Sequence, residues 1–168
     1  HAQIINPEDI PKFSRFSIVP SVQATHATSD MYWAEKRLGK DRLKKGAYAY
    51  QTLLDQLGWL PNGTDFPVEN INPLFTFYAS VFRTDHTGWP EGGWLNDEAL
   101  TREQALRSIT VWPAKAAFSE NEFGSLAPGM KADFVMLDTD LMHASPGEIL
   151  KAKIESTWID GRKVYELK

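Results

Sequence analysis

The order of the secondary-structure signals constrains the fold of this chain more than any single residue does. Up to about residue 118, short extended segments alternate with helical patterns, such as the apolar run at residues 73–83 that begins with a proline. From residue 119 the pattern becomes β-rich, with an apolar strand expected at residues 134–137. Asp160-Gly161 then joins two strand-like runs, which is a strong hairpin signal. The sequence therefore predicts an α/β part, residues 1–118, and a β-rich part, residues 119–168.

Local signals place the elements of the α/β part. Strand-like runs occur at residues 1–5, at 17–23 and from 59 onward. Residues 24–30, which include His26, are polar and are expected to form a loop. Thr101 and Gln104 have the spacing of a capping box and predict a helix start. Helices are expected at residues 7–16, 30–38, 47–57, 73–83 and 102–118.

Composition limits the classes of protein to which the chain can belong. It has 168 residues, a formal net charge of −4 and 42% hydrophobic residues, which is enough for one domain with a core. No apolar run reaches the roughly 18 residues of a membrane span. The net negative charge argues against nucleic acid as a partner, and the basic residues between 36 and 45 are interpreted as a solvated face. With no cysteine, disulfides and thiolate ligands are excluded.

One stretch places an acid where a site is expected. Asn62-Gly63 is typical of a turn, and Thr64-Asp65 follows it directly, with Pro67 favouring an extended Phe66. An acid at the end of a strand can project over the edge of a sheet, where α/β folds build their sites. By itself, Asp65 can equally be a surface turn residue.

Five stretches in order suggest a family. They are His1-Ala2-Gln3, Pro20-Ser21-Val22-Gln23-Ala24-Thr25-His26, Gly46-Ala47-Tyr48-Ala49, Gly63-Thr64-Asp65-Phe66-Pro67-Val68-Glu69 and Gly124-Ser125-Leu126-Ala127-Pro128-Gly129-Met130-Lys131-Ala132-Asp133-Phe134. Together they cover nearly the whole chain. The chain resembles the C-terminal half of the amidohydrolase superfamily, in the family 3 branch that includes N-substituted formamide deformylase and D-aminoacylase-like hydrolases.

This resemblance implies a fold and a set of roles. The chain would supply about strands six to eight of a TIM-type (β/α)₈ barrel, and its β-rich tail would belong to a composite β-sandwich. His1 and Asp65 would be ligands of a divalent metal, which we expect to be zinc, with one or two ions in the complete enzyme. Asp65 would also be the catalytic acid that takes a proton from the attacking water. His26 would lie beside a small amide-type substrate.

The same resemblance implies that other parts of the site lie outside this sequence. The family's ligands on strands one, four and five have no counterpart here, so we interpret the chain as a portion of an enzyme that cleaves C–N bonds. The isolated chain is then expected to be inactive and to hold the metal incompletely. The alternative is a catalytically silent C-terminal module with a role in association or regulation. Exposed strand edges make self-association plausible, and a cytoplasmic location is slightly favoured.

The remaining candidates are assigned structural roles. We expect His86 to pack at the rim of the barrel and His143 to be unrelated to the site. Glu69 is interpreted as a local hydrogen-bonding or capping residue. Arg83 and Arg102 are interpreted as surface charges.

Overall fold

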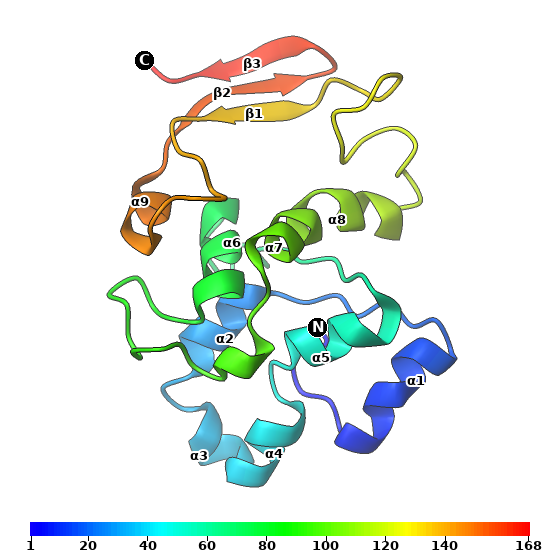
Figure 1. Cartoon of the computed structure of the whole chain (residues 1–168), viewed down its shortest axis with the longest axis vertical. Coiled ribbons are helices and arrows are strands. Elements are labelled where there is room, and N and C mark those ends of the chain that lie inside the picture. Colours follow the sequence, from blue (N-terminus) through cyan, green and yellow to red (C-terminus); the bar gives the residue numbers. More distant parts are fainter.

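Helices and strands occupy different parts of the molecule (Figure 1). The computed structural model describes every residue, His1–Lys168. Helices form the larger part, and a three-stranded sheet carrying the C-terminus lies at one end. None of the helices is long and apolar enough to cross a lipid bilayer. The helices are η1 (Pro7–Asp9), α1 (Ile10–Arg15), α2 (Ala24–Asp30), α3 (Ala34–Leu38), α4 (Lys40–Gly46), α5 (Tyr50–Leu57), α6 (Pro73–Phe82), η2 (Asn96–Glu98), α7 (Arg102–Ile109), α8 (Val111–Ala116) and α9 (Pro146–Lys151).

Three extended segments run through the helical part, although none is long enough to be a regular strand. The N–H of Ala2 donates to the carbonyl of Ser21 at 2.8 Å. Val22 forms a parallel bridge with Asn62, in which its N–H donates to Pro61 and its carbonyl accepts from Gly63, both at 3.0 Å. These bonds place residues 1–3, 21–23 and 61–63 side by side. Asn62 is therefore part of this extended pairing and not of the turn predicted from Asn62-Gly63.

Helix α3 begins at Ala34, not near residue 30 as predicted, and α4 was not predicted. Two further differences have a structural cause. Residues 24–30 form α2 instead of a polar loop, and four of its residues, including His26, are buried. The helix predicted from residue 47 begins only at Tyr50. Ala47 forms an antiparallel bridge with Ile4, and Tyr48 has a φ of 51°, so this segment is extended and then turns before the helix starts. In both places contacts with distant segments determine the local structure.

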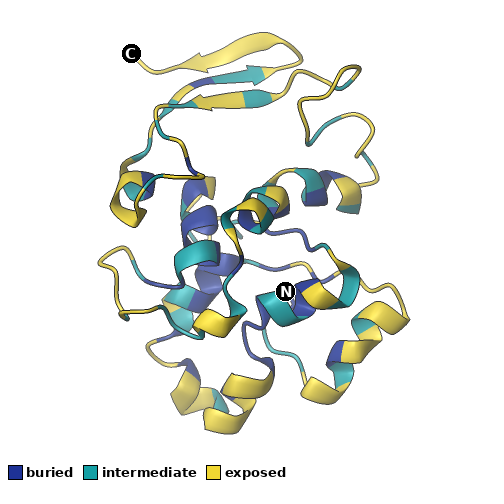
Figure 2. Ribbon diagram, in the orientation of Figure 1, coloured by how far each residue is buried: buried dark blue, intermediate teal, exposed yellow.

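The hydrophobic core lies between the helices (Figure 2). Helix α6 is at its centre and packs against α2, α7 and α9. Phe77 of α6 and Leu53 of α5 are fully buried, as is Ile149, which brings α9 into the same cluster. The predicted capping box of α7 is present, since Thr101 and Gln104 each accept a backbone N–H from the other.

The C-terminal sheet has the predicted strands. It is antiparallel in the order β1 (Phe134–Leu137), β2 (Ile154–Ile159) and β3 (Arg162–Glu166), with the hairpin turn at Asp160-Gly161. Phe134 lies opposite Trp158, and their rings stack 5.5 Å apart. Every residue of β3 is exposed, and Ser156 of β2 is the one buried residue in the three strands.

Arg83 is buried and not a surface charge as predicted. It is 0% exposed, and its guanidinium donates to the carbonyls of Trp94 at 3.0 Å and Tyr48 at 3.3 Å. The guanidinium carbon lies 5.0 Å from the centre of the Tyr50 ring. Burial lowers the pKa of Arg83 from its ordinary value. Arg102 is also partly buried, and it donates to the carbonyls of Leu141 and Ala144 in the segment before α9.

Asp85 organises the loop that follows α6. One carboxylate oxygen accepts the N–H and hydroxyl of Thr87 and the N–H of Trp89, at 2.6–3.0 Å. The other accepts the hydroxyl of Tyr32 at 2.5 Å, and the Tyr32 and Trp89 rings stack 5.3 Å apart. The hydrogen bond from the Thr87 hydroxyl, followed by that from Tyr32, lowers the pKa of Asp85 far below its ordinary range.

Replacing Arg83 with alanine is expected to lower the free energy of unfolding by about 3 kcal/mol, because two carbonyls lose their donors and a cavity opens. Urea denaturation followed by tryptophan fluorescence measures this change. Arg107→Ala is the matched control, since Arg107 is half-exposed and pairs only with Glu103. Its expected effect is below about 0.5 kcal/mol. Equal effects of the two substitutions would contradict the structural role of Arg83.

Asp85→Asn is expected to have a pH-dependent effect on stability. The folded pKa of Asp85 lies below the unfolded value, so its stabilisation is complete above about pH 4 and is lost as the pH falls further. The difference in urea midpoint between the parent and Asp85→Asn should therefore be largest at neutral pH and shrink under acid. Asp97→Asn, which changes an exposed carboxylate without hydrogen bonds, should show no such trend. A difference that stays constant down to pH about 2 would contradict this assignment.

Candidate metal centre

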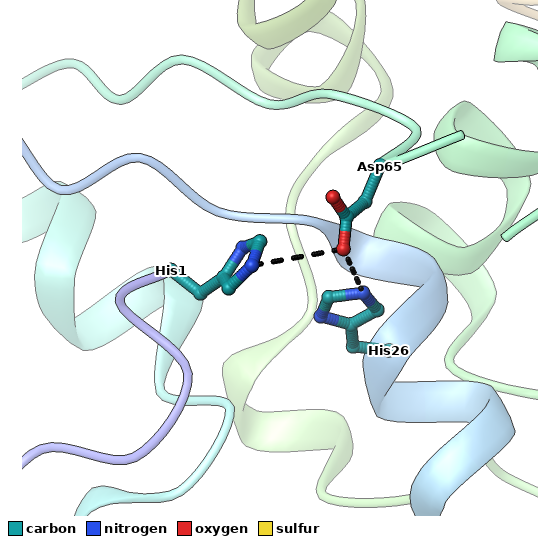
Figure 3. Close-up of side chains that lie close together, drawn as sticks. All are labelled: His1, His26 and Asp65. Atoms are coloured by element: carbon teal, nitrogen blue, oxygen red, sulfur yellow. Dashed lines mark ion pairs between the residues drawn. The ribbon is translucent and has the colours of Figure 1, made fainter. Parts of the chain in front are cut away.

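The side chains of His1, His26 and Asp65 converge at one end of the three extended segments (Figure 3). Nε2 of His26 lies 3.1 Å from Oδ2 of Asp65, and Nε2 of His1 lies 3.7 Å from the same oxygen. The two imidazole rings are 5.3 Å apart, edge to face. One ligand atom from each residue lies within 4.8 Å of the others. All three site residues predicted from the sequence are thus brought together.

The close atoms in this cluster are not hydrogen-bonded to one another. Although Nε2 of His26 is 3.1 Å from the Asp65 oxygen, the pair lacks the angle of a hydrogen bond, and both ring nitrogens of His26 are buried without a partner. The distance from His1 to Asp65 is too long for a hydrogen bond. A buried imidazole without a partner is costly, so His26 has unused capacity to bind a ligand.

These separations agree with a common metal ligand sphere. Two donors bound to zinc at 2.0–2.1 Å in tetrahedral geometry are about 3.3 Å apart. The 3.1 Å and 3.7 Å distances to Asp65 bracket this value. Two imidazoles and one carboxylate are also a known catalytic zinc donor set, which leaves a fourth position open. The residues present therefore fit a divalent ion.

Asp65 is held by a turn that begins at its own backbone. It has a φ of 59°, and its carbonyl accepts the N–H groups of Val68 at 2.8 Å and Glu69 at 3.3 Å. Left-handed backbone is accessible to aspartate at modest cost. Glu69 in turn accepts the Ser29 hydroxyl at 2.6 Å, which connects this turn to α2. The side chain of Glu69 thus bonds a residue distant in sequence, and the local role predicted for it is wrong.

His1 is positioned by its neighbours on the paired segments. Its Nδ1 is hydrogen-bonded to Oε1 of Gln23, a carbonyl oxygen that can only accept, so Nδ1 donates in this bond and Nε2 faces Asp65. Sequence reasoning did not identify Gln23. Its position three residues before His26 was the available signal.

A second polar cluster joins the segment of His1 to the last residue of α2. One oxygen of Asp30 accepts from Nε2 of Gln3 at 2.6 Å and from the Tyr48 hydroxyl at 2.7 Å. Burial, followed by the hydrogen bond to Asp30, raises the pKa of Tyr48 well above its ordinary value. Tyr48 therefore remains a hydrogen-bond donor at all physiological pH values. These hydrogen bonds fix the C-terminal end of α2 without involving the side chains of His1, His26 or Asp65.

The other histidines lie outside the cluster. His86 packs against the rings of Phe75 at 4.4 Å and Tyr78 at 5.8 Å. His143 is exposed, and its Nδ1 lies 2.7 Å from a carboxylate oxygen of Asp140. Neither belongs to the cluster of His1, His26 and Asp65, as the sequence analysis predicted.

Comparison with known proteins gives a consistent result. The chain is 34% identical over 165 residues to Arabidopsis thaliana protein LONG AFTER FAR-RED 3, a match covering 98% of this chain and 28% of that protein. It is 31% identical to the putative amidohydrolase YtcJ of Bacillus subtilis (99% and 31%), and 29% identical over 119 residues to N-substituted formamide deformylase of Arthrobacter pascens (71% and 21%). The chain thus spans less than a third of the length of these relatives.

A solved structure supports the relationship. An uncharacterized metal-dependent hydrolase from Pyrococcus horikoshii OT3 superposes with a TM-score of 0.76 at 30% identity, covering 88% of this chain and 29% of the other. A sequence model described as the amidohydrolase family, in its family 3 form, matches residues 1–165. The chain belongs to the amidohydrolase family.

Proposed function

We propose that this chain is the C-terminal portion of a metal-dependent amidohydrolase and that His1, His26 and Asp65 are donors to its divalent metal, with zinc as the expected ion. The observation that carries the proposal is the convergence of three donors from three separate segments, with no hydrogen bond between them. For His26, the 3.1 Å approach to Asp65 favours a ligand role over the substrate contact predicted from the sequence.

The proposed reaction is hydrolysis of a C–N bond in a small amide, formamide or N-acyl substrate. A divalent ion, when bound, supplies the Lewis acidity that makes water a usable nucleophile near neutral pH. Asp65 takes the proton from the attacking water and delivers it to the nitrogen as the C–N bond breaks. Gln23 keeps His1 in the tautomer whose Nε2 lone pair faces Asp65. Buried His26 keeps one side of the cluster free of solvent.

We further propose that the three extended segments are the final strands of a (β/α)₈ barrel and that β1–β3 belong to a composite β-sandwich. The parallel bridge between Val22 and Asn62 supports the first part, because barrel strands are parallel and their carboxyl ends carry the site. The remaining ligands and substrate contacts would lie in the longer part of the protein. The short share of each relative that this chain matches agrees with that arrangement.

A second candidate function is a catalytically silent module that serves in association. The observation in its favour is the exposure of β3 and of apolar residues beside Asp65, such as Phe66 and Val68, which are 59% and 74% exposed. Metal binding separates the two functions, since a silent module has no need of a competent donor set.

The resemblance implied that this chain alone holds the metal incompletely, but three convergent donors are the number that a catalytic zinc site uses. The isolated chain is therefore expected to bind one Co²⁺ or Zn²⁺ per molecule, measured by the visible absorption of cobalt and by competition with zinc. His26→Ala and Asp65→Ala should each weaken binding at least about tenfold, because each removes a donor. His143→Ala, which removes an exposed histidine outside the cluster, should leave binding unchanged.

The outcomes separate the assignments. Unchanged metal affinity in His26→Ala, with weaker binding in Asp65→Ala, would favour the substrate contact predicted for His26 from the sequence over a ligand role. A parent chain that binds neither ion would favour the silent module.

In the longer protein, Asp65→Asn is expected to lower kcat by about 10²–10⁴-fold, because the proton acceptor is lost. Initial rates of amide hydrolysis, with circular dichroism as the check on folding, provide the measurement. Asp97→Asn is the matched control and should retain the parent rate. An active Asp65→Asn enzyme would rule out Asp65 as the proton acceptor.

A further inference from the structure

Asn62 has a buried side chain that contacts three other elements. It is 6% exposed, and its Oδ1 accepts the N–H of Ala24, the first residue of α2, at 3.0 Å. Its Nδ2 donates to the hydroxyl of Ser80 in α6 at 3.0 Å and to that of Ser108 in α7 at 3.3 Å. The sequence predicted only a turn at Asn62, and the proposed reaction gives this residue no role. It lies three residues before Asp65.

The two serines fix the orientation of the Asn62 amide. The Ser80 hydroxyl donates to the carbonyl of Thr76 at 2.7 Å, and the Ser108 hydroxyl donates to that of Ala105 at 2.8 Å. With their protons used, both hydroxyls accept from Nδ2. Oδ1 is therefore left to face Ala24, and a flipped amide would set a donor against a donor. The network specifies one position for the side chain.

Through Oδ1, Asn62 stabilises the start of the helix that carries His26. Helix termini leave backbone N–H groups without intrahelical partners, and α2 has no cap of its own, since the side chain of Gln23 makes no such bond. Asn62 supplies the missing acceptor from a segment 38 residues away. His26 follows Ala24 by two residues, so it belongs to the same first turn.

Through the backbone, the same residue is tied to Asp65. Gly63 donates to the carbonyl of Val22 at 3.0 Å, and the N–H of Asn62 donates to the carbonyl of Ser108 at 2.9 Å. Only Gly63 and Thr64 separate Asn62 from Asp65. The backbone pairing of Val22 thus holds the two segments together, and the buried side-chain bond from Asn62 to Ala24 ties the first residue of α2 itself to the Asp65 segment.

We propose that Asn62 is the positioning residue of the site, one that aligns His26 with Asp65 without contacting metal or substrate. The inference rests on the proposed function, because its expected effect is a change in metal affinity. The effect of Asn62 on the separation of His26 and Asp65 does not depend on that function. A role limited to core stability predicts a different result, because Ser80 and Ser108 contribute to stability through the same network.

The test compares variants that remove different parts of the network. Asn62→Leu keeps the approximate size but removes the acceptor for Ala24, and Asn62→Asp keeps an oxygen at that place. Ser80→Ala removes a partner of Nδ2 and leaves the bond to Ala24 intact. Co²⁺ is titrated into each full chain and followed by its visible absorption, with urea midpoints measured in parallel.

Asn62→Leu is expected to weaken Co²⁺ binding by about 10–100-fold and to change the cobalt spectrum, because an outer partner that orients donors is lost. Asn62→Asp should restore binding, and Ser80→Ala should bind as the parent does even where it lowers the urea midpoint. Parent-like binding by Asn62→Leu, or equal weakening by Ser80→Ala, would overturn the inference. If Asn62→Leu does not fold, Asn62→Ser replaces it, since its hydroxyl is too short to reach Ala24.

A second readout decides the case in which the parent binds no Co²⁺, which would count against the proposed function. Nuclear Overhauser contacts between the His26 ring and the Asp65 side chain are then compared. Positioning by Asn62 requires these contacts in the parent and in Ser80→Ala, and their loss in Asn62→Leu. Their persistence in Asn62→Leu would show that other contacts set the geometry.

Discussion

The site depends on backbone pairing between three short extended segments. The bonds from Ala2 to Ser21 and between Val22 and residues 61–63 are few, yet they bring His1, His26 and Asp65 together from positions up to 64 residues apart in the chain. So few bonds cannot by themselves resist the conformational freedom of the chain. The helices that pack around the segments, with α6 at the centre, supply the burial that keeps the pairing in place.

The sequence predicted the parts of this arrangement whose signals are local. The hairpin at Asp160-Gly161 and the helix beginning at Pro73 follow from turn and cap chemistry within a few residues. Recognition of the family on five motifs placed His1, His26 and Asp65 in one site. The misjudged positions depend on distant groups. Residues 24–30 are polar and have no cap of their own, so the sequence predicts a loop there. They form a helix because the side chain of Asn62 supplies the acceptor for Ala24.

Arg83 illustrates the same limit for charge. An arginine at the end of an apolar helix is ordinarily a solvated residue. Here Arg83 adopts a φ of 56° and its side chain enters the core, where carbonyls of Tyr48 and Trp94 and the ring of Tyr50 surround it. Those partners lie on other segments, so no pattern near residue 83 identifies them. The burial of this charge can be derived only from the tertiary structure.

The three side chains proposed as metal donors are held in place to different degrees. His26 is buried on α2, which is fixed through Ala24 at one end and Asp30 at the other. Asp65 is held by its own turn and by the segment of Asn62. The side chain of His1 is 50% exposed and relies on Gln23. For the proposed metal role, a preorganised pair with one adjustable donor would lower the entropy cost of binding an ion and let the coordination adapt. In the proposed metal site, His26 and Asp65 would therefore be the preorganised donors and His1 the adjustable one.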